Sequence, residues 1–164
     1  MCALDTFFVL RGEVVRRFCD VVGAGFFRTG PARLGLTCFD ETVTDLFGEA
    51  GPAVVFAHEW GHVAQFESGV LDITGQGVGD PPSVLVENQA DCLAGAWVAE
   101  QVDEEFGPFA DPGALDDSLG ALIYVRDQPG SDPNAALAHG SGFDRVRAFQ
   151  DGVNRSVEYC ATYV

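Results

Sequence analysis

A five-residue string, His58-Glu59-Trp60-Gly61-His62, contains the side chains that point most directly to chemistry. Residues four apart lie on the same face of a helix, so this spacing places the two imidazoles one above the other. Two ring nitrogens placed in this way can bind one Zn²⁺ ion. The carboxylate of Glu59 can reach a metal-bound water without binding the metal itself. The string therefore predicts a zinc-dependent hydrolytic site in which Glu59 accepts a proton from that water.

A second, acidic string begins at Glu87, twenty-five residues after His62, and ends at Asp91. A catalytic zinc site commonly has three protein ligands and one open position, so Glu87 is the predicted third ligand. Asp91, one helical turn later, is placed to accept the spare N–H of a ligand histidine, which would fix its tautomer and raise its basicity. Both residues could instead be ordinary solvated positions of an amphipathic helix, and that alternative stays open at this point.

The chain has three histidines, and the third, His139, precedes a predicted helix. It could reach the site and stabilise the oxyanion of a tetrahedral intermediate as a catalytic residue. An exposed histidine beside a helix cap at Ser141 is an equally good interpretation.

Within the first string, Gly61 costs about 1 kcal/mol relative to Ala in a helix, which indicates close backbone approach, either in the core or at a substrate site.

The elements that must position these residues follow from the periodicity of the apolar side chains and from Gly and Pro. We expect a helix over about residues 52–68, a loop over 69–82 and a second long helix over about 83–104. Further expected elements are helices over about residues 5–22, 111–127 and 142–150 and a short strand over 33–39. These elements predict a mainly α domain, or an α+β domain with at most a small β-sheet.

The bulk composition indicates one globular domain over residues 1–164. Hydrophobic residues make up 47% of the chain, which is enough to bury a core at this length. The formal net charge of −16 repels phosphate backbones, so no nucleic-acid partner is expected. The five cysteines form no Cys-x-x-Cys pair and give no indication of a cysteine metal site.

No transmembrane segment is expected, because no run approaches the roughly 18 apolar residues that cross a bilayer. No basic residue precedes the first apolar run and Arg11 interrupts it, so no secretory signal peptide is evident. The chain as it stands is therefore expected in the cytoplasm, unless an export segment is missing from it. Nothing in the sequence indicates an oligomeric state.

Three separated motifs resemble the bacterial neutral zinc metallopeptidases and, more distantly, the thermolysin-like gluzincins. They are the HExxH string with Gln65, the segment from Glu87 to Trp97, and the segment from His139 to Arg145. The resemblance covers roughly residues 50–160, whereas the segment 1–49 is divergent. It implies a zincin-like fold with Glu59 as catalytic base, Asp91 orienting a ligand histidine, and zinc bound by His58, His62 and Glu87.

Other expectations follow from the same resemblance. Members of the family often carry an amino-terminal anchor or export signal, so an extracytoplasmic location is the alternative to the cytoplasm. In zincins a strand before the metal-binding helix pairs with the substrate backbone. Cys92 and Cys160 are placed so that a disulfide could join the second long helix to the carboxy terminus in an oxidising compartment. Asn88 departs from the family, which usually has an apolar residue there.

The predicted function is that of a zinc-dependent endopeptidase, and the expected partner is a peptide or an unfolded protein segment. A metal-stabilised binding or regulatory domain without turnover is the alternative from a different class. A zinc hydrolase that acts on non-peptide amides is a third interpretation, because the same ligands could serve it.

Overall fold

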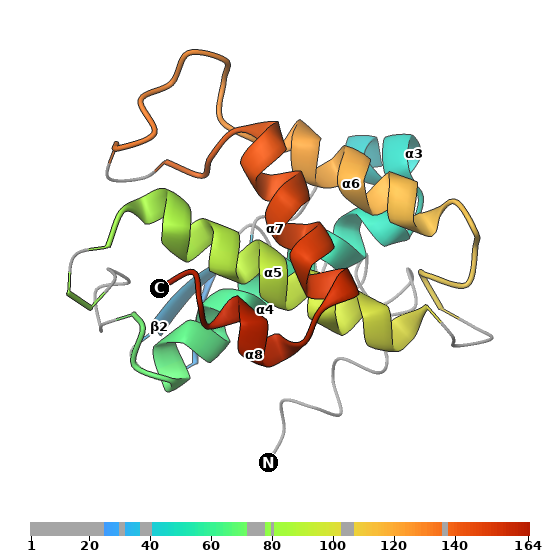
Figure 1. Ribbon diagram of the computed structural model, residues 1–164. Helices are drawn as coiled ribbons and strands as arrows, with labels where there is room; N and C mark the ends of the chain where they lie inside the picture. Colours follow the sequence, from blue (N-terminus) through green and yellow to red (C-terminus); the bar gives the residue numbers. More distant parts are fainter. Residues whose placement is uncertain are drawn as a thin grey trace.

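Two long helices, α4 (Ala50–Glu67) and α5 (Ser83–Gln101), lie side by side at the centre of the protein (Figure 1). The computed structural model describes residues 25–29, 32–36, 41–71, 78–79, 81–102, 107–135 and 138–164. The other elements of this described part are β1 (Gly25–Thr29), β2 (Ala32–Leu36), α3 (Glu41–Phe47), α6 (Ala114–Tyr124), α7 (Gly142–Asn154) and α8 (Val157–Cys160). The fold is mainly helical with one small sheet, as the sequence predicts.

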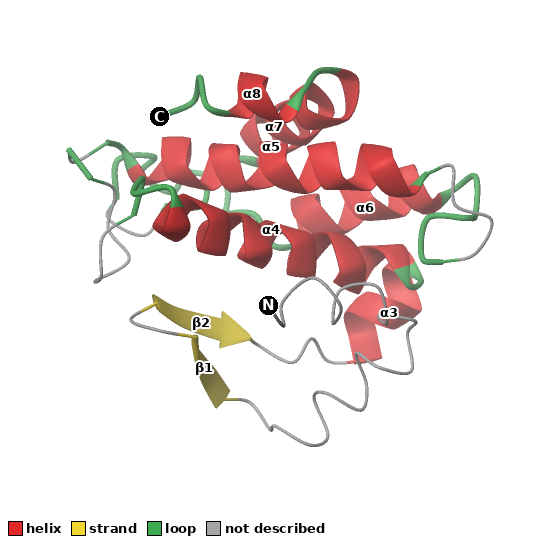
Figure 2. Ribbon diagram, turned by 90° about the horizontal axis from the view of Figure 1, so that it is seen from below, coloured by secondary structure: helices red, strands yellow, loops and turns green. Residues whose placement is uncertain are grey.

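The elements form layers on either side of the central pair, as Figure 2 shows. β1 and β2 make an antiparallel hairpin, in which Gly25 pairs with Leu36 and Thr29 with Ala32. The hairpin lies on the side of α4, with β2 in contact with that helix, whereas α7 and α8 cover α5. α3 and α6 also pack against α4. The pair α4–α5 is therefore enclosed by the hairpin on one side and by the carboxy-terminal helices on the other.

The close approach of α4 and α5 depends on a glycine. A Cβ atom at Gly61 would lie only 3.0 Å from Ala90 Cα and 3.1 Å from the Ala90 carbonyl oxygen. The crossing lies next to His62 on one helix and one turn from Glu87 on the other. Of the two explanations for this glycine, close packing in the core is the one observed here, and it brings the predicted ligands together.

A second close crossing joins α5 to α7. A Cβ atom at Gly95 would overlap the carbonyl group of Phe149, and a Cβ atom at Gly152 would overlap the carbonyl group of Cys92. Any larger residue at either position would force the two helices apart. The backbone contact at these glycines brings the polar side chains of α7 within reach of the middle of α5.

Apolar side chains from α4, α5, α6 and α7 form one core. Its largest fully buried members are Leu122 and Phe149, which are 0% and 1% exposed, and burying a side chain of this size stabilises the fold by about 1.5–3 kcal/mol. Phe109 packs edge-on against Trp97, with ring centroids 5.4 Å apart. A single core of this kind is that of one domain.

Most of the predicted elements agree with the structure. The helices predicted over 52–68, 83–104 and 142–150 are α4, α5 and α7, and the strand predicted over 33–39 is β2. The helix predicted over 111–127 starts later, because Asp111 accepts the N–H of Gly113 in a turn and α6 begins at Ala114. The segments β1, α3 and α8 were not predicted: α3 and α8 are too short to show a helical periodicity, and β1 has no alternation of apolar and polar residues.

The helix predicted over residues 5–22 and half of the loop predicted over 69–82 lie outside the described residues. Among the helices that the structure does describe, none is both long enough and apolar enough to cross a bilayer.

Candidate metal centre

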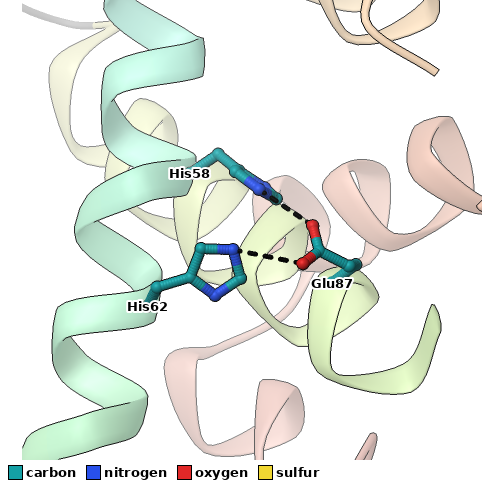
Figure 3. A group of neighbouring side chains, drawn as sticks. All are labelled: His58, His62 and Glu87. Carbon is teal, nitrogen blue, oxygen red and sulfur yellow. Dashed lines mark ion pairs between the residues drawn. The ribbon is translucent and has the colours of Figure 1, made fainter. Parts of the chain in front are cut away.

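Three side chains from α4 and α5 meet between these helices (Figure 3). His58 Nε2 lies 3.2 Å from Glu87 Oε2, and His62 Nε2 lies 3.4 Å from Glu87 Oε1. One possible ligand atom from each residue can be chosen so that all three lie within 4.8 Å of one another. The His58 side chain is buried, whereas 22% of the His62 side chain and 14% of the Glu87 side chain are exposed, so solvent can reach the group. The structure thus brings together the three residues that the sequence predicts as ligands.

The outer nitrogen of His58 belongs to a charged network made of His58, Asp91 and Arg145. His58 Nδ1 donates to Asp91 Oδ1 over 2.7 Å. The Arg145 guanidinium, from α7, binds the same carboxylate twice, with Nη2 at 2.8 Å from Oδ1 and Nε at 3.0 Å from Oδ2. Asp91 and Arg145 are 0% and 1% exposed. The paired charges offset the cost of removing each from water, which would otherwise be several kcal/mol per ion.

The outer nitrogen of His62 belongs to a neutral network made of His62, Gln65, Gln89 and the backbone of Cys160. His62 Nδ1 donates to Gln65 Oε1 over 2.7 Å. Gln65 Nε2 donates to Gln89 Oε1 over 3.0 Å and to the carbonyl oxygen of Val86 over 2.7 Å. Gln89 Nε2 then donates to the Cys160 carbonyl oxygen over 3.2 Å. Every link joins an amide or imidazole donor to a carbonyl oxygen, and no member carries a charge when His62 is neutral.

These two networks decide which nitrogen of each imidazole is free. A carboxylate can only accept a hydrogen bond, and Gln65 presents its oxygen to His62 because its NH₂ group is used elsewhere. Each neutral ring therefore carries its proton on Nδ1, and its Nε2 atom has an unshared electron pair. Both electron pairs are directed at the group around Glu87.

The Glu87 carboxylate fits a site that holds a cation. Within the described residues, Glu87 Oε2 is buried and accepts no hydrogen bond, although His58 Nε2 lies only 3.2 Å away. Two nitrogen electron pairs and a carboxylate repel one another unless a positive charge lies among them. Imidazole nitrogen with carboxylate oxygen is a donor set that zinc commonly takes in catalytic sites, so the residues fit this metal.

The same need for positive charge changes the protonation of the site. Burial by itself would lower the pKa of His58, but the charge and hydrogen bond of Asp91, with the neighbouring Glu87 carboxylate, raise it from 6.5 to about 9 against the charge of Arg145. Burial would likewise raise the pKa of Glu87, but its contacts with His58 and His62 hold that pKa below its usual range. A proton and a metal ion therefore compete for His58 Nε2.

Glu59, the predicted proton acceptor, follows His58 on α4 and precedes His62 by less than one turn. Its side chain is half-buried, in contrast to the fully buried Asp91. Solvent can therefore reach the Glu59 side chain, and its role as proton acceptor stays a prediction.

His139, the other predicted catalytic residue, is not one of the three grouped side chains. Its imidazole is 51% exposed, and Nδ1 lies 3.5 Å from Asp127 Oδ1. The other oxygen of Asp127 accepts the backbone N–H groups of His139 and Gly140 over 2.8 and 2.9 Å. A Cβ atom at Gly140 would lie 3.7 Å from Asn88 Oδ1, so this loop runs beside the turn of α5 that carries Glu87.

The structure also agrees with the other interpretation of His139, that of an exposed histidine beside a helix cap at Ser141. Ser141 caps α7 by accepting the N–H of Asp144, whose carboxylate in turn accepts the N–H of Ser141. His139 is thus an exposed residue beside a helix cap, and its contribution to an oxyanion site stays a prediction.

Three residues of the networks lie within the motifs of the family resemblance but were given no role there: Gln65, Gln89 and Arg145. Gln65 could have been found, because it lies three residues after His62 and thus on the same face of the helix. Arg145 is a buried cation among apolar positions of α7, and such a residue requires a buried anion. Gln89 gives no comparable signal, because its partners are Gln65 on another helix and a backbone carbonyl 71 residues away.

Comparison with known proteins gives one family match. The family is described as "Putative neutral zinc metallopeptidase", and the match covers residues 31–163. It therefore begins before the three motifs and includes β2.

Three curated relatives also match, among them the uncharacterized proteins Mb2605 of Mycobacterium bovis and Rv2575 of Mycobacterium tuberculosis. Each is 31% identical over 158 residues, which cover 85% of this chain and 52% of the relative. The chain thus spans about half the length of the curated relatives it matches. No solved structure matches it.

Proposed function

From the premise that this chain belongs to the neutral zinc metallopeptidase family, as the match over residues 31–163 shows, we propose that it is a peptidase that hydrolyses peptide bonds with the aid of one zinc ion. The observation that carries the proposal is the convergence of His58 Nε2, His62 Nε2 and the Glu87 carboxylate beside a half-buried Glu59.

His58, His62 and Glu87 would hold the metal. When bound, zinc supplies a Lewis acid that polarises a carbonyl group and lowers the pKa of water toward about 7. Three protein ligands leave a position open, which is the arrangement of catalytic rather than structural zinc sites. The partial exposure of His62 and Glu87 favours this interpretation, because structural sites are closed to solvent.

Glu59 has the role of the proton carrier. It accepts a proton from the attacking water as the new C–O bond forms at the peptide carbonyl. It then gives that proton to the amide nitrogen as the C–N bond breaks, so the amine leaves in neutral form. Asp91 orients His58 and raises its basicity. His139 is the proposed donor to the oxyanion, from a loop that Asp127 holds beside α5.

The proposed substrates are peptides or unfolded segments of proteins. The net charge of −16 disfavours nucleic acid, and it also favours substrates without a strongly acidic character.

A zinc-loaded sample incubated with a diverse peptide pool, with products identified by mass spectrometry, tests the proposal. We expect the wild type to cut peptides and zinc-loaded Glu59→Gln to bind the metal but lose turnover by at least 10²-fold. Glu67→Gln changes an exposed glutamate of the same helix and is the matched control, with unchanged activity expected.

Two results would overturn the proposal. Full activity in Glu59→Gln would remove the proton carrier from the mechanism. Equal inactivity of the wild type and the variant, with one zinc bound to each, would favour a metal-stabilised binding or regulatory domain instead.

A further inference from the structure

The carboxy-terminal segment is connected to the metal centre through two glutamines, because its backbone ends the neutral network of His62. Gln89, which is 5% exposed, spans the distance between Gln65 and the Cys160 carbonyl oxygen. A four-residue helix at the end of a chain, such as α8, has little stability of its own. Something else must therefore hold this carbonyl in place.

A disulfide supplies that support. Cys160 is joined to Cys92 of α5, with Cα atoms 5.5 Å apart, and both residues are 0% exposed. Cys92 lies on α5 between Gln89 and the crossing with α7 at Gly95. The bridge therefore fixes the end of the chain to the same helix that carries Glu87.

The order of donors and acceptors in the network runs in one direction only. The Cys160 carbonyl oxygen can only accept, so Gln89 turns its NH₂ group toward it and its oxygen toward Gln65. Gln65, 1% exposed, then turns its NH₂ group toward Gln89 and the Val86 carbonyl, and its oxygen toward His62. The final consequence is a proton on Nδ1 of His62 and a free electron pair on Nε2.

We propose that Gln65 and Gln89 are positioning residues for the metal ligand His62, and that the Cys92–Cys160 disulfide contributes to metal affinity by holding the carbonyl on which their orientation depends. The inference rests on the proposed function only in taking His62 as a ligand. Gln65 has the larger effect, because it touches the imidazole. Gln89 and the disulfide have smaller ones, because the Val86 carbonyl also helps to orient Gln65.

Zinc affinity, measured by competition with a chromophoric chelator, tests the proposal. Gln65→Met should weaken zinc binding by about 10–100-fold, the usual effect of removing the partner of a ligand histidine. Gln89→Met, and separately the double variant Cys92→Ser, Cys160→Ser, should each weaken it by about three- to tenfold, because they act one step further away. Gln150→Met makes the same chemical change at an exposed position of α7 and should leave affinity unchanged.

A control variant distinguishes a general loss of protein stability from a loss of the orientation of His62. Phe109→Ala removes a core contact with Trp97 that belongs to neither network, and it should lower the thermal midpoint without weakening zinc binding. Nitrogen-15 NMR of His62 gives an independent readout. The neutral ring should carry its proton on Nδ1 in the wild type and in Phe109→Ala, and should become a mixture of tautomers in Gln65→Met.

Unchanged zinc affinity in Gln65→Met and Gln89→Met would overturn the inference, and so would an equal loss in Phe109→Ala. If the double cysteine variant does not fold, Gln89→Met with its disulfide intact still decides the question. A wild type that binds no zinc would instead refute the proposed function, so the two failures are distinguishable.

Discussion

The two histidines of the site are held by networks that differ in charge and in the element they reach. The charged network connects His58 through Asp91 to Arg145 on α7, over contacts of 2.7–3.0 Å. The neutral network connects His62 through two glutamines to the backbone near the carboxy terminus. One histidine is thus tied to a buried ion pair and the other to a series of amides.

The difference in charge gives the two networks different contributions to stability. Removing one partner of a buried ion pair costs about 3–5 kcal/mol, because the other charge is left without compensation. Removing one amide from a neutral network costs about 1–3 kcal/mol. The charged network therefore contributes to folding as well as to the basicity of its histidine, whereas the neutral network mainly fixes an orientation.

The largest expected effect comes from breaking the ion pair. Arg145→Met leaves the buried Asp91 carboxylate with His58 as the remaining cation of its network, so the free energy of unfolding should fall by up to about 3–5 kcal/mol, as measured by urea denaturation without zinc. Arg155→Met removes an exposed arginine, whose ion pair with Asp151 should contribute less than about 1 kcal/mol.

The double variant Asp91→Leu, Arg145→Met sharpens this test. It removes both charges, so it should recover part of the stability that Arg145→Met loses. A loss in Arg145→Met no larger than that in Gln89→Met would contradict the distinction between the networks.

A smaller effect is expected when the charge of Asp91 is removed but its shape is kept. Asp91→Asn should weaken zinc binding by about 10–100-fold, because the His58 ring loses an anionic partner that raises its basicity. Asp151→Asn on α7 is the matched control and should bind zinc like the wild type. An affinity of Asp91→Asn equal to that of the wild type would show that Asp91 serves folding alone.

The pH dependence of zinc binding follows from the His58 pKa of about 9. The folded-state pKa of His58 lies above the unfolded value of 6.5. In the metal-free protein, the proton on His58 therefore contributes its full stabilisation below pH 6.5, and this stabilisation is lost as the pH rises through about 9. Zinc must displace that proton, so its affinity should rise by up to about tenfold per pH unit below 9 and then level off.

Titration calorimetry in buffers of different ionisation enthalpy would count the protons released per zinc. We expect about one proton from His58 near neutral pH. In Asp91→Asn, zinc affinity should level off at a lower pH, because this variant lacks the carboxylate that raises the pKa of His58. A flat pH profile in both proteins would contradict the competition between proton and metal.

The parts of the site that could be predicted from the sequence are those that depend on local spacing. His58 and His62 share a face because they are four residues apart, and Asp91 follows Glu87 by the same interval. The long helices α4 and α5 were also predicted, since each carries a helical periodicity over several turns.

What could not be predicted depends on contacts between distant segments. The partner of Asp91 is 54 residues away, and the contact requires the close crossing of α5 and α7 that Gly95 and Gly152 allow. Helix periodicity shows that a face is buried, but it does not show which helix covers it. The hairpin strand β1 was missed for a different reason, since the adjacent Phe26 and Phe27 interrupt the alternation of apolar and polar residues that indicates a strand.

X-ray absorption spectroscopy at the zinc edge, on the zinc-loaded protein, tests most directly the claim that His58, His62 and Glu87 form one metal site. We expect two imidazole nitrogens at about 2.0–2.1 Å, oxygen ligands at about 2.0–2.2 Å and no sulfur, with one imidazole lost in His62→Ala. A sulfur ligand at about 2.3 Å, or two imidazoles still present in His62→Ala, would contradict the account.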